Sequence, residues 1–370
     1  MKTLIISVTA GEGHNASAKA IKEVYDLNGE YSEIADGLSY ISPLLSKFIG
    51  FSHIVIYRHF PKLFNFGYTQ SEKKPKLFSK GSLIYKILKL GTKKLYNHIK
   101  SGEFDTVICT HPFAGIILTE VIEKYSISLK TGFVATDFTC SPSTRECNLD
   151  RFFIPDVKLI DDFNKGLITP DKIVPVGIPI RQKFYSKTDK IKAKNALGIE
   201  SDKKHIVVMC GSMGCGPLAQ LSVNFAASMT DCEFSIICGT NKKLKKSLDK
   251  KAKAFKNLHI HGFINDMPLV LDSADLYLTK PGGLSTSEAV AKEIPMLFVN
   301  TVAACETYNL KHYLSYEVAE SGKNVRELTE KCKNIINDDN KLDTFKANLK
   351  KINKANSAMK IRETMENLEK

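Results

Sequence analysis

The stretch that decides the fold is Leu276–Ala291, which reads LYLTKPGGLSTSEAVA. Its first four residues are typical of a buried strand, and its last seven are typical of a helix. Between them lies a turn built on Gly282 and Gly283, where the backbone can approach a ligand closely and the next helix favours an anion. A strand, a glycine turn and a helix in this order predict a parallel α/β sheet with an anion-binding loop at its carboxyl edge.

The same alternation extends outward through the C-terminal half. Short apolar runs predict buried strands, and the segments between them predict helices. The expected strands are His205–Cys210, Glu233–Cys238, Leu258–His261, Leu276–Thr279 and Met296–Val299, and the expected helices are Pro217–Ala227, Lys242–Phe255, Met267–Asp272 and Ser285–Ala291. This half therefore reads as one doubly wound domain, 205–370.

The N-terminal half repeats the pattern. Its expected strands are Leu4–Val8, Tyr31–Ala35, Thr106–Thr110, Lys130–Ala135, Arg151–Ile154 and Ile173–Val176, with helices over Ala16–Tyr25 and Gly115–Lys124. Residues 1–180 thus form a first domain, and the charged segment 181–204 is expected to be a linker. Two such domains predict an α/β protein whose ligand site lies in a cleft between them.

The composition indicates a globular protein without a disulfide framework, a structural zinc site or a membrane span. The 370 residues and 43% apolar content suit two packed domains. The nine cysteines lack a C-x-x-C spacing, and several sit in strand-like runs, so neither a disulfide framework nor a structural zinc site is expected. The chain opens on a strand and has no apolar stretch of about twenty residues, so we expect a cytoplasmic protein, free or peripherally bound to the cell membrane.

Positive charge is concentrated in residues 45–100. This segment holds twelve of the Lys and Arg residues and one acid, Glu72, against a net charge of +13 for the chain. Ten aromatic residues are interleaved with these charges. Such a mixture suits an anionic membrane surface, although a nucleic-acid partner or an ordinary solvated helical face would show the same pattern.

The first glycine loop follows the first strand and contains Gly11, Gly13, His14 and Asn15. A histidine at the end of a strand can act as a general base near pH 7, although it can also cap or pack against a helix. The loop also fits G-x-G-x-x-A with Asp36 after the second strand, which is a weak dinucleotide-binding pattern.

The second glycine loop is built from Gly211, Ser212, Met213 and Gly214. It offers backbone N–H groups, a hydroxyl and a helix N-terminus to a phosphate pair. It lacks the Lys-Ser/Thr ending of a P-loop, which disfavours ATP hydrolysis.

Three polar residues accompany the strands of the C-terminal half. Glu288, expected in the first helical turn, can accept two ribose hydroxyls or simply complement the helix N-terminus. Glu306 and Asn309 follow the last predicted strand and can hold sugar hydroxyls or cap a helix.

Six motifs in order resemble the monogalactosyldiacylglycerol synthase and processive diacylglycerol glucosyltransferase family, relatives of the peptidoglycan glycosyltransferase MurG. The motifs are GEGHNASA at 11–18, TD at 136–137, GIP at 177–179, GSMG at 211–214, CGTN at 238–241 and TKPGGLSTSEA at 279–289. The resemblance covers nearly the whole chain, and the last motif is its most specific part.

The resemblance implies a GT-B fold, with the terminal helix crossing back to the first domain, and a UDP-sugar donor, UDP-glucose or UDP-galactose. It places the uracil near Phe263, the ribose on Glu288, the diphosphate over Gly211–Gly214 and the Gly282-Gly283 turn, and the sugar on Glu306 and Asn309. Ser287 belongs to the same donor set. The acceptor would be a lipid hydroxyl reached from an anionic membrane through residues 45–100, beside a loop of Gly11, Gly13 and Asn15.

The same resemblance implies a single inverting displacement with one base, His14 first and Asp137 second. No D-x-D motif stands in a suitable loop, so no metal and no cofactor are expected, and backbone amides would stabilise the leaving diphosphate. Two departures bear on the substrates. Family members carry a His and a Trp soon after TD, where this chain has 138–144 without either, and their G-Q-E is Ala304-Cys305-Glu306 here.

Other interpretations remain open at the level of sequence. The acceptor could be a different lipid or a polyprenyl-linked molecule, or the protein could be a UDP-sugar epimerase of the same architecture. A nicotinamide-dependent dehydrogenase built on the first loop would leave the second and third glycine motifs without a role. A non-enzymatic membrane-surface protein would explain residues 45–100 alone. No nucleic-acid partner is expected.

Overall fold

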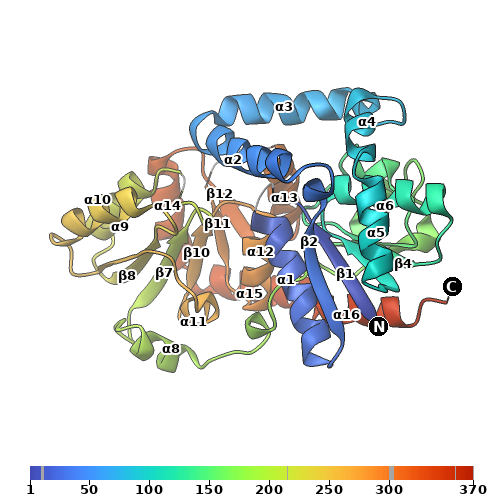
Figure 1. Cartoon of the computed structure of the whole chain (residues 1–370). Coiled ribbons are helices and arrows are strands. Elements are labelled where there is room, and N and C mark those ends of the chain that lie inside the picture. The colour runs from blue at the N-terminus through green and yellow to red at the C-terminus, as the bar shows by residue number, and fades with distance from the viewer. Residues whose placement is uncertain (10–11, 215, 300–303, 355, 370) are drawn as a thin grey trace. The chain divides into compact units, whose positions relative to one another are not determined.

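The computed structural model describes residues 1–9, 12–214, 216–299, 304–354 and 356–369 (Figure 1). The chain divides into two compact units. Unit 1 comprises Met1–Gln182, Val302–Tyr308 and Asn356–Lys370, and unit 2 comprises Lys183–Thr301 and Asn309–Ala355. The predicted α/β class with two doubly wound sheets is confirmed, since each unit is built on a six-stranded sheet flanked by helices.

The sheet of unit 1 has the order β2-β1-β3-β4-β5-β6 and is parallel throughout. Its strands are β1 (Lys2–Ser7), β2 (Tyr31–Asp36), β3 (Thr106–Cys109), β4 (Lys130–Val134), β5 (Arg151–Ile154) and β6 (Ile173–Pro175). In register, Ile5 of β1 stands opposite Ile34 and Ile108. Because the strands are parallel, the loops that follow them gather at one edge.

The main helices of unit 1 are α1 (Glu12–Leu27), α2 (Pro43–His59), α3 (Pro61–Lys73), α4 (Leu83–Lys89), α5 (Thr92–Ser101), α6 (Pro112–Tyr125), α7 (Ile160–Phe163) and α16 (Ser357–Glu366). The last of these packs on α1, and its Ile361 and Met365 are fully buried in the core of this unit. Arg362 of α16 donates to both carboxylate oxygens of Glu30, at 2.7 and 3.1 Å. The C-terminal helix is therefore part of the N-terminal unit.

The sheet of unit 2 has the order β12-β11-β10-β7-β8-β9, again parallel throughout. Its strands are β7 (Lys204–Met209), β8 (Cys232–Ile237), β9 (Leu258–His261), β10 (Leu276–Thr279), β11 (Met296–Phe298) and β12 (Ala319–Ser321), and its helices are α8 (Lys190–Ala196), α9 (Leu218–Ser228), α10 (Lys242–Ala252), α11 (Met267–Asp272), α12 (Gly283–Ala291), α14 (Val325–Ile336) and α15 (Asp339–Ile352). Helix α13 (Ala304–Ser315) contributes residues to both units.

Several element boundaries differ from the sequence prediction, and three of these differences concern the glycine loops and the linker. Helix α1 begins at Glu12 rather than Ala16, because the acidic Glu12 suits a first turn. Helix α12 begins at Gly283 rather than Ser285. From Lys183 on, the expected linker is grouped with unit 2, where α8 packs on α11.

The basic segment 45–100 is mostly helical and contains most of α2, all of α3 and α4, and α5 up to Lys100. All eleven of its lysines are exposed. Among the described residues, no helix combines the length and apolarity that crossing a bilayer requires.

Candidate catalytic and donor-binding loops

In unit 2, the glycine motifs meet at the carboxyl edge of the sheet. The GSMG loop follows β7, and the CGTN loop follows the neighbouring strand β8. Thr240 N donates to Ser212 O at 2.9 Å, and Asn241 Nδ2 donates to Gly214 O at 3.2 Å. Two motifs that are 27 residues apart in sequence therefore form one structure, joined by hydrogen bonds.

Glycine is required in this structure for two reasons. Gly214 and Gly239 have φ angles of +58° and +55°, a region that other residues enter at a cost. A Cβ on Gly214 would lie 2.2 Å from Cys238 O, and one on Gly239 would lie 2.0 Å from Ser212 O. The close approach of the two loops explains why both motifs carry glycine there.

Lys280 joins the third motif to this edge. A Cβ on Gly211 would stand 2.9 Å from Lys280 Cε, so the lysine side chain lies against the start of the GSMG loop. Helix α12 opens next to Lys280, with Gly282 as its first capping residue and no side-chain cap on its N–H groups. The edge thus combines a helix N-terminus, a lysine and a glycine loop, which together suit a diphosphate.

Glu288 is the sixth residue of α12, so it lies beyond the first turn where the sequence analysis placed it. The reading of Glu288 as a complement to the helix N-terminus is therefore wrong, because that effect is confined to the first turn. Ser287 Oγ donates to Gly283 O at 2.8 Å, which leaves the oxygen lone pairs of Ser287 as acceptors. Glu288 is half-buried.

The other predicted donor residues differ in exposure. Phe263 follows β9 and is 64% exposed, so its ring is available for stacking. Asn309 is fully buried, and its Nδ2 donates to Pro281 O at 2.9 Å, which fixes the turn that leads into α12. Glu306 is buried as well. The predicted sugar contacts of Glu306 and Asn309 stay predictions.

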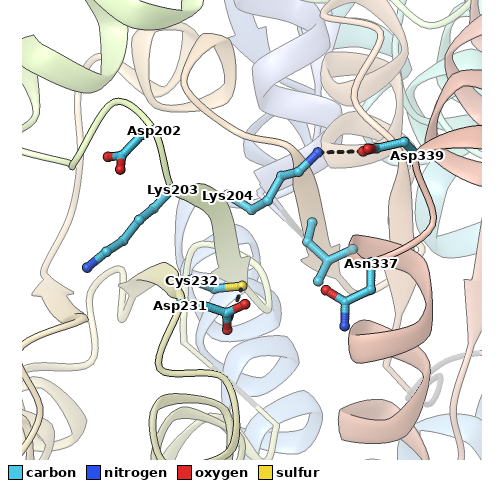
Figure 2. Close-up of a pocket in the computed structure, with 8 residues that line it drawn as sticks. Asp202, Lys203, Lys204, Asp231, Cys232, Asn337 and Asp339 are labelled. Atoms are coloured by element: carbon cyan, nitrogen blue, oxygen red, sulfur yellow. Dashed lines mark hydrogen bonds and ion pairs between the residues drawn. The ribbon is translucent and has the colours of Figure 1, made fainter.

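A hollow of about 530 Å³ lies at the opposite, amino edge of the same sheet (Figure 2). Its lysines are paired, since Lys204 Nζ lies 2.7 Å from Asp339 Oδ1 and Lys203 contacts Glu200 and Glu233. The strands β7 and β8 begin at this edge, whereas the glycine loops follow their ends. The hollow is therefore separate from the predicted donor site.

In unit 1, the carboxyl edge is built around His14. This residue lies in the first turn of α1, and its Nδ1 is 2.7 Å from Thr110 O and 3.0 Å from Thr136 Oγ1. A carbonyl oxygen can only accept, so Nδ1 carries the proton and Nε2 keeps its lone pair. Burial lowers the pKa of His14 to about 4, although the hydrogen bond to Thr110 opposes this shift. His14 is therefore a neutral imidazole near pH 7, and the lone pair on its Nε2 can accept a proton.

His111 stands beside this base with the complementary tautomer. It caps α6, where its Nδ1 accepts from Phe113 N at 3.1 Å, so its proton lies on Nε2. The two rings meet edge to face with centroids 4.7 Å apart. Burial, with His14 and His53 nearby, holds the pKa of His111 well below its usual value.

Sequence reasoning missed His111 and also two residues from the basic segment. His53 of α2 lies close enough to contribute to lowering the pKa of His14, after burial and against the Thr110 hydrogen bond. Tyr68 of α3 has its pKa raised by burial, with smaller contributions from Cys305 and Asp137. The rule that ligands bind beyond the ends of parallel strands could have found His111, which follows β3.

The remaining predicted residues around the first loop hold the loop in place through hydrogen bonds. Gly11 lies outside the described residues, and Gly13 is in the first turn of α1. Asn15 Oδ1 accepts from Ser7 Oγ at 2.6 Å. Asp36 accepts from Leu38 N at 2.9 Å, from Ser46 Oγ at 2.7 Å and from the Thr9 hydroxyl. With these partners Asp36 ties the loop together, which removes the support for a ribose-binding role in a dinucleotide site.

Asp137 and the altered loop that follows it also lie at this edge. Asp137 is half-buried, directly after Thr136. The thiols of Cys140 and Cys147 are buried, and a Cβ on Gly115 of α6 would stand 2.6 Å from Cys147 Sγ. The segment 138–147 is therefore packed into unit 1 through these buried cysteines and through Phe138, which is buried as well.

The two six-stranded parallel sheets, each with ligand-binding loops at its carboxyl edge, are the architecture of a GT-B fold. Residues 14–180 match the family described as monogalactosyldiacylglycerol (MGDG) synthase, and residues 205–368 match the glycosyltransferase family 28 C-terminal domain. The two matches together span nearly the whole chain, which is therefore built from an N-terminal MGDG synthase domain and a C-terminal glycosyltransferase family 28 domain.

Individual relatives agree with this placement. The chain is 26% identical over 98% of its length to the processive diacylglycerol beta-glucosyltransferase of Bacillus pumilus, covering 94% of that protein, and 26% identical over 84% of its length to the Staphylococcus saprophyticus enzyme of the same name, covering 78% of it. Among solved structures, it superposes on Acinetobacter baumannii MurG with a TM-score of 0.63 and 14% identity over the whole of both chains. A UDP-GlcNAc 2-epimerase from Neisseria meningitidis gives 0.65 with 13% identity, again over both whole chains.

These comparisons confirm the predicted fold and family. The epimerase and the transferase superpose about equally well, so the fold alone does not separate them. The two family matches separate a transferase from an epimerase, since both describe glycosyltransferases. In the parts of the chain that the structure describes, no group of three or more His, Cys, Asp or Glu side chains is arranged to hold a metal ion. The expectation of a metal-independent reaction stays a prediction.

Proposed function

We propose that the protein transfers a hexose from UDP-glucose or UDP-galactose to a lipid hydroxyl, that of diacylglycerol or a glycosyldiacylglycerol, with inversion at the anomeric carbon. The observation that carries this proposal is the match to processive diacylglycerol beta-glucosyltransferases along almost the whole chain. The two loop systems supply the chemistry that such a reaction needs.

The donor belongs to unit 2 in this proposal. Phe263 stacks on the uracil, Glu288 accepts from the ribose hydroxyls, and the diphosphate lies over Gly211–Gly214 and the Gly282-Gly283 turn. The N–H groups of α12 have no side-chain cap and therefore face the charge that develops on the leaving UDP. Backbone amides and Lys280 provide this stabilisation, so the reaction requires no cofactor.

The base belongs to unit 1. His14 accepts the proton of the lipid hydroxyl at Nε2 while Nδ1–H stays bonded to Thr110 O. This bond fixes the tautomer and helps to stabilise the imidazolium that forms during the displacement. Asp137 is the second candidate, either as the base or as a group that orients it.

The lipid side of the proposal rests on α2 and α3. Six large apolar side chains on these helices and on Phe60, the residue that joins them, are exposed by 56 to 78% of their surface: Leu44, Phe48, Phe51, Phe60, Leu63 and Phe66. We call these six residues the lipid-facing surface. Exposed apolar residues with lysines around them suit an anionic bilayer, where each inserted aromatic ring adds to binding and the lysines attract the lipid charge. The protein would then act as a peripheral membrane enzyme on the cytoplasmic side.

The proposal is tested by incubating the protein with UDP-glucose or UDP-galactose and vesicles that contain diacylglycerol. We expect a glycosyldiacylglycerol as product and UDP as the by-product, with one of the two donors preferred. Chelation of divalent metal should leave the rate unchanged. Glycosylation of water-soluble acceptors alone would refute the lipid acceptor, and conversion of the UDP-sugar without transfer would favour the epimerase.

A further inference from the structure

Two histidines at the carboxyl edge of unit 1 are anchored by one short run of backbone, residues 110–113, which directly follows β3. His14 Nδ1 donates to Thr110 O at 2.7 Å. His111 Nδ1 accepts from Phe113 N at 3.1 Å, because His111 is the N-cap residue of α6. Each ring is therefore fixed through its Nδ1 atom, which leaves its Nε2 atom for other partners.

The two Nε2 atoms have opposite hydrogen-bonding roles. A carbonyl oxygen only accepts, so His14 carries its proton on Nδ1 and a lone pair on Nε2. A backbone N–H only donates, so His111 carries its proton on Nε2. Among the residues that the structure describes, neither Nε2 atom has a hydrogen-bonding partner, and both side chains are only half-buried. This edge therefore offers a hydrogen-bond acceptor beside a hydrogen-bond donor.

The His111 ring is held by two neighbouring rings. It meets the His14 ring edge to face with centroids 4.7 Å apart, and the Phe113 ring edge to face with centroids 4.8 Å apart. The helix cap fixes its tautomer in addition. Because both the orientation and the tautomer are set before a ligand binds, a hydrogen bond from the N–H of His111 requires little further ordering.

A donor and an acceptor at this spacing suit two oxygens on neighbouring carbon atoms. Each imidazole nitrogen reaches an oxygen about 2.9 Å away, and the two rings are 4.7 Å apart. A hydroxyl bonded to His14 Nε2 thus brings an oxygen on the next carbon toward the N–H of His111. In 1,2-diacylglycerol this second oxygen is the ester oxygen on C2, and every hydroxyl of a hexose also has an oxygen on a neighbouring carbon.

We propose that His111 is an acceptor-binding residue whose Nε2–H donates to the oxygen on the carbon next to the reacting hydroxyl. The inference rests on the proposed lipid acceptor and deepens it. It defines the acceptor class as alcohols with an oxygen on the neighbouring carbon, which includes diacylglycerol and glycosyldiacylglycerol alike. No covalent bond changes at His111, which selects and orients the acceptor while His14 takes the proton.

The test uses two acceptors that differ in the position of one oxygen. The 2-hydroxyethyl ester of a medium-chain fatty acid has its ester oxygen on the carbon next to the hydroxyl, and the 3-hydroxypropyl ester has it one carbon further away. Both are supplied in the same neutral detergent micelles, with the UDP-sugar that the wild type uses on diacylglycerol. The wild type should prefer the 2-hydroxyethyl ester by about tenfold in kcat/KM, the upper end for one hydrogen bond between neutral groups.

Two variants separate acceptor binding from the capping of α6. His111→Asn keeps a hydrogen-bond acceptor near the place of Nδ1 and is a good N-cap, but it has no N–H near the place of Nε2. His111→Gln has a longer side chain whose amide reaches the place of Nε2, but Gln is not a favoured N-cap residue. The two variants therefore divide the two functions of the imidazole between them.

In His111→Asn we expect the thermal midpoint of the wild type and no preference between the two esters. In His111→Gln the midpoint should fall, and most of the preference should remain. The reverse result, with the preference kept in His111→Asn and lost in His111→Gln, would show that His111 only caps α6 and would overturn the proposal. Equal kcat/KM on the two esters in the wild type would overturn it as well. A wild type that makes no glycolipid from diacylglycerol would instead refute the proposed function.

Discussion

The carboxyl edges of the two sheets are built from different materials. In unit 2 the edge consists of backbone, because Gly214 and Gly239 bring two loops together in conformations that glycine adopts readily. In unit 1 it consists of side chains, since His14, His111 and Asp137 come from three separate segments. In the proposed function, this difference corresponds to binding of the diphosphate by unit 2 and proton transfer by unit 1.

The largest effect is expected from His14→Asn. If this variant lost UDP binding, the division of roles between the two units would be wrong. Loss of a general base costs typically 10²- to 10⁴-fold in rate, so turnover should fall by at least a hundredfold. Binding of UDP, followed by thermal protection, should be unchanged, because His14 lies in unit 1. Turnover within a few-fold of the wild type would eliminate His14 as the base and leave Asp137.

Gly239→Ala tests the backbone side of the comparison. Its Cβ would collide with Ser212 O, so the GSMG loop must move and UDP affinity should fall tenfold or more. Gly198→Ala is the matched control, because Gly198 also has a positive φ, +70°, but an added Cβ meets no atom within 4 Å. That variant should lose about 1–2 kcal/mol of stability and bind UDP normally. Equal UDP affinity in the two variants would contradict the assigned donor loop.

The pH dependence of turnover tests whether His14 is a buried, neutral base. Its pKa is about 4 in the folded protein against 6.5 in the unfolded chain, so the neutral base persists well below pH 6.5. Turnover per folded molecule should therefore stay level as the pH falls through 6.5 and decline only toward about 4. A decline in the rate centred at 6.5, with the protein still folded, would show a solvated histidine.

Stability follows the same titration. Between pH 6.5 and about 4, His14 binds a proton in the unfolded chain but not in the folded protein. The contribution of His14 to the free energy of unfolding is therefore fully present above pH 6.5 and is lost as the pH falls through this range. His205 adds to this effect from unit 2, because burial lowers its pKa to about 4 as well. Unfolding must accordingly be followed beside activity, by circular dichroism at each pH.

The smallest effect is expected from surface charge. Lys73, Lys74 and Lys76 are exposed at the end of α3, and replacing all three by Gln should weaken binding to anionic vesicles several-fold and reduce its dependence on salt. The same change at Lys250, Lys251 and Lys253, exposed in unit 2, is the control. Equal losses in both triple variants would mean that charge acts generally and that residues 45–100 are a solvated face.

The contrast between the two edges also explains what the sequence could predict. A turn that needs glycine is encoded by residues that are neighbours in the sequence. The glycine motifs of unit 2 and the class of fold could therefore be predicted from the sequence. The edge strand β12 was missed, because Ala319–Ser321 has no apolar run. Glu288 was expected in the first turn and lies in the second, because the predicted helix began two residues too late.

Side-chain constellations are harder to read. His14 was found because glycines surround it, but His111 and His53 follow no local pattern. They reach His14 through the sheet order and the packing of α2, which join residues 39 to 97 positions apart. The ties of Asp36 to Ser46 and Thr9 depend in the same way on a helix that charge alone marked as a surface feature.

The central claim is a single displacement with one base, His14, acting on a donor held by unit 2. The most direct test is the anomeric configuration of the glycolipid made from an α-linked UDP-hexose, read from the proton NMR coupling of its anomeric proton. One displacement predicts a β-linked product. An α-linked product would require retention, for which a single base at Nε2 of His14 gives no route, and would contradict the account.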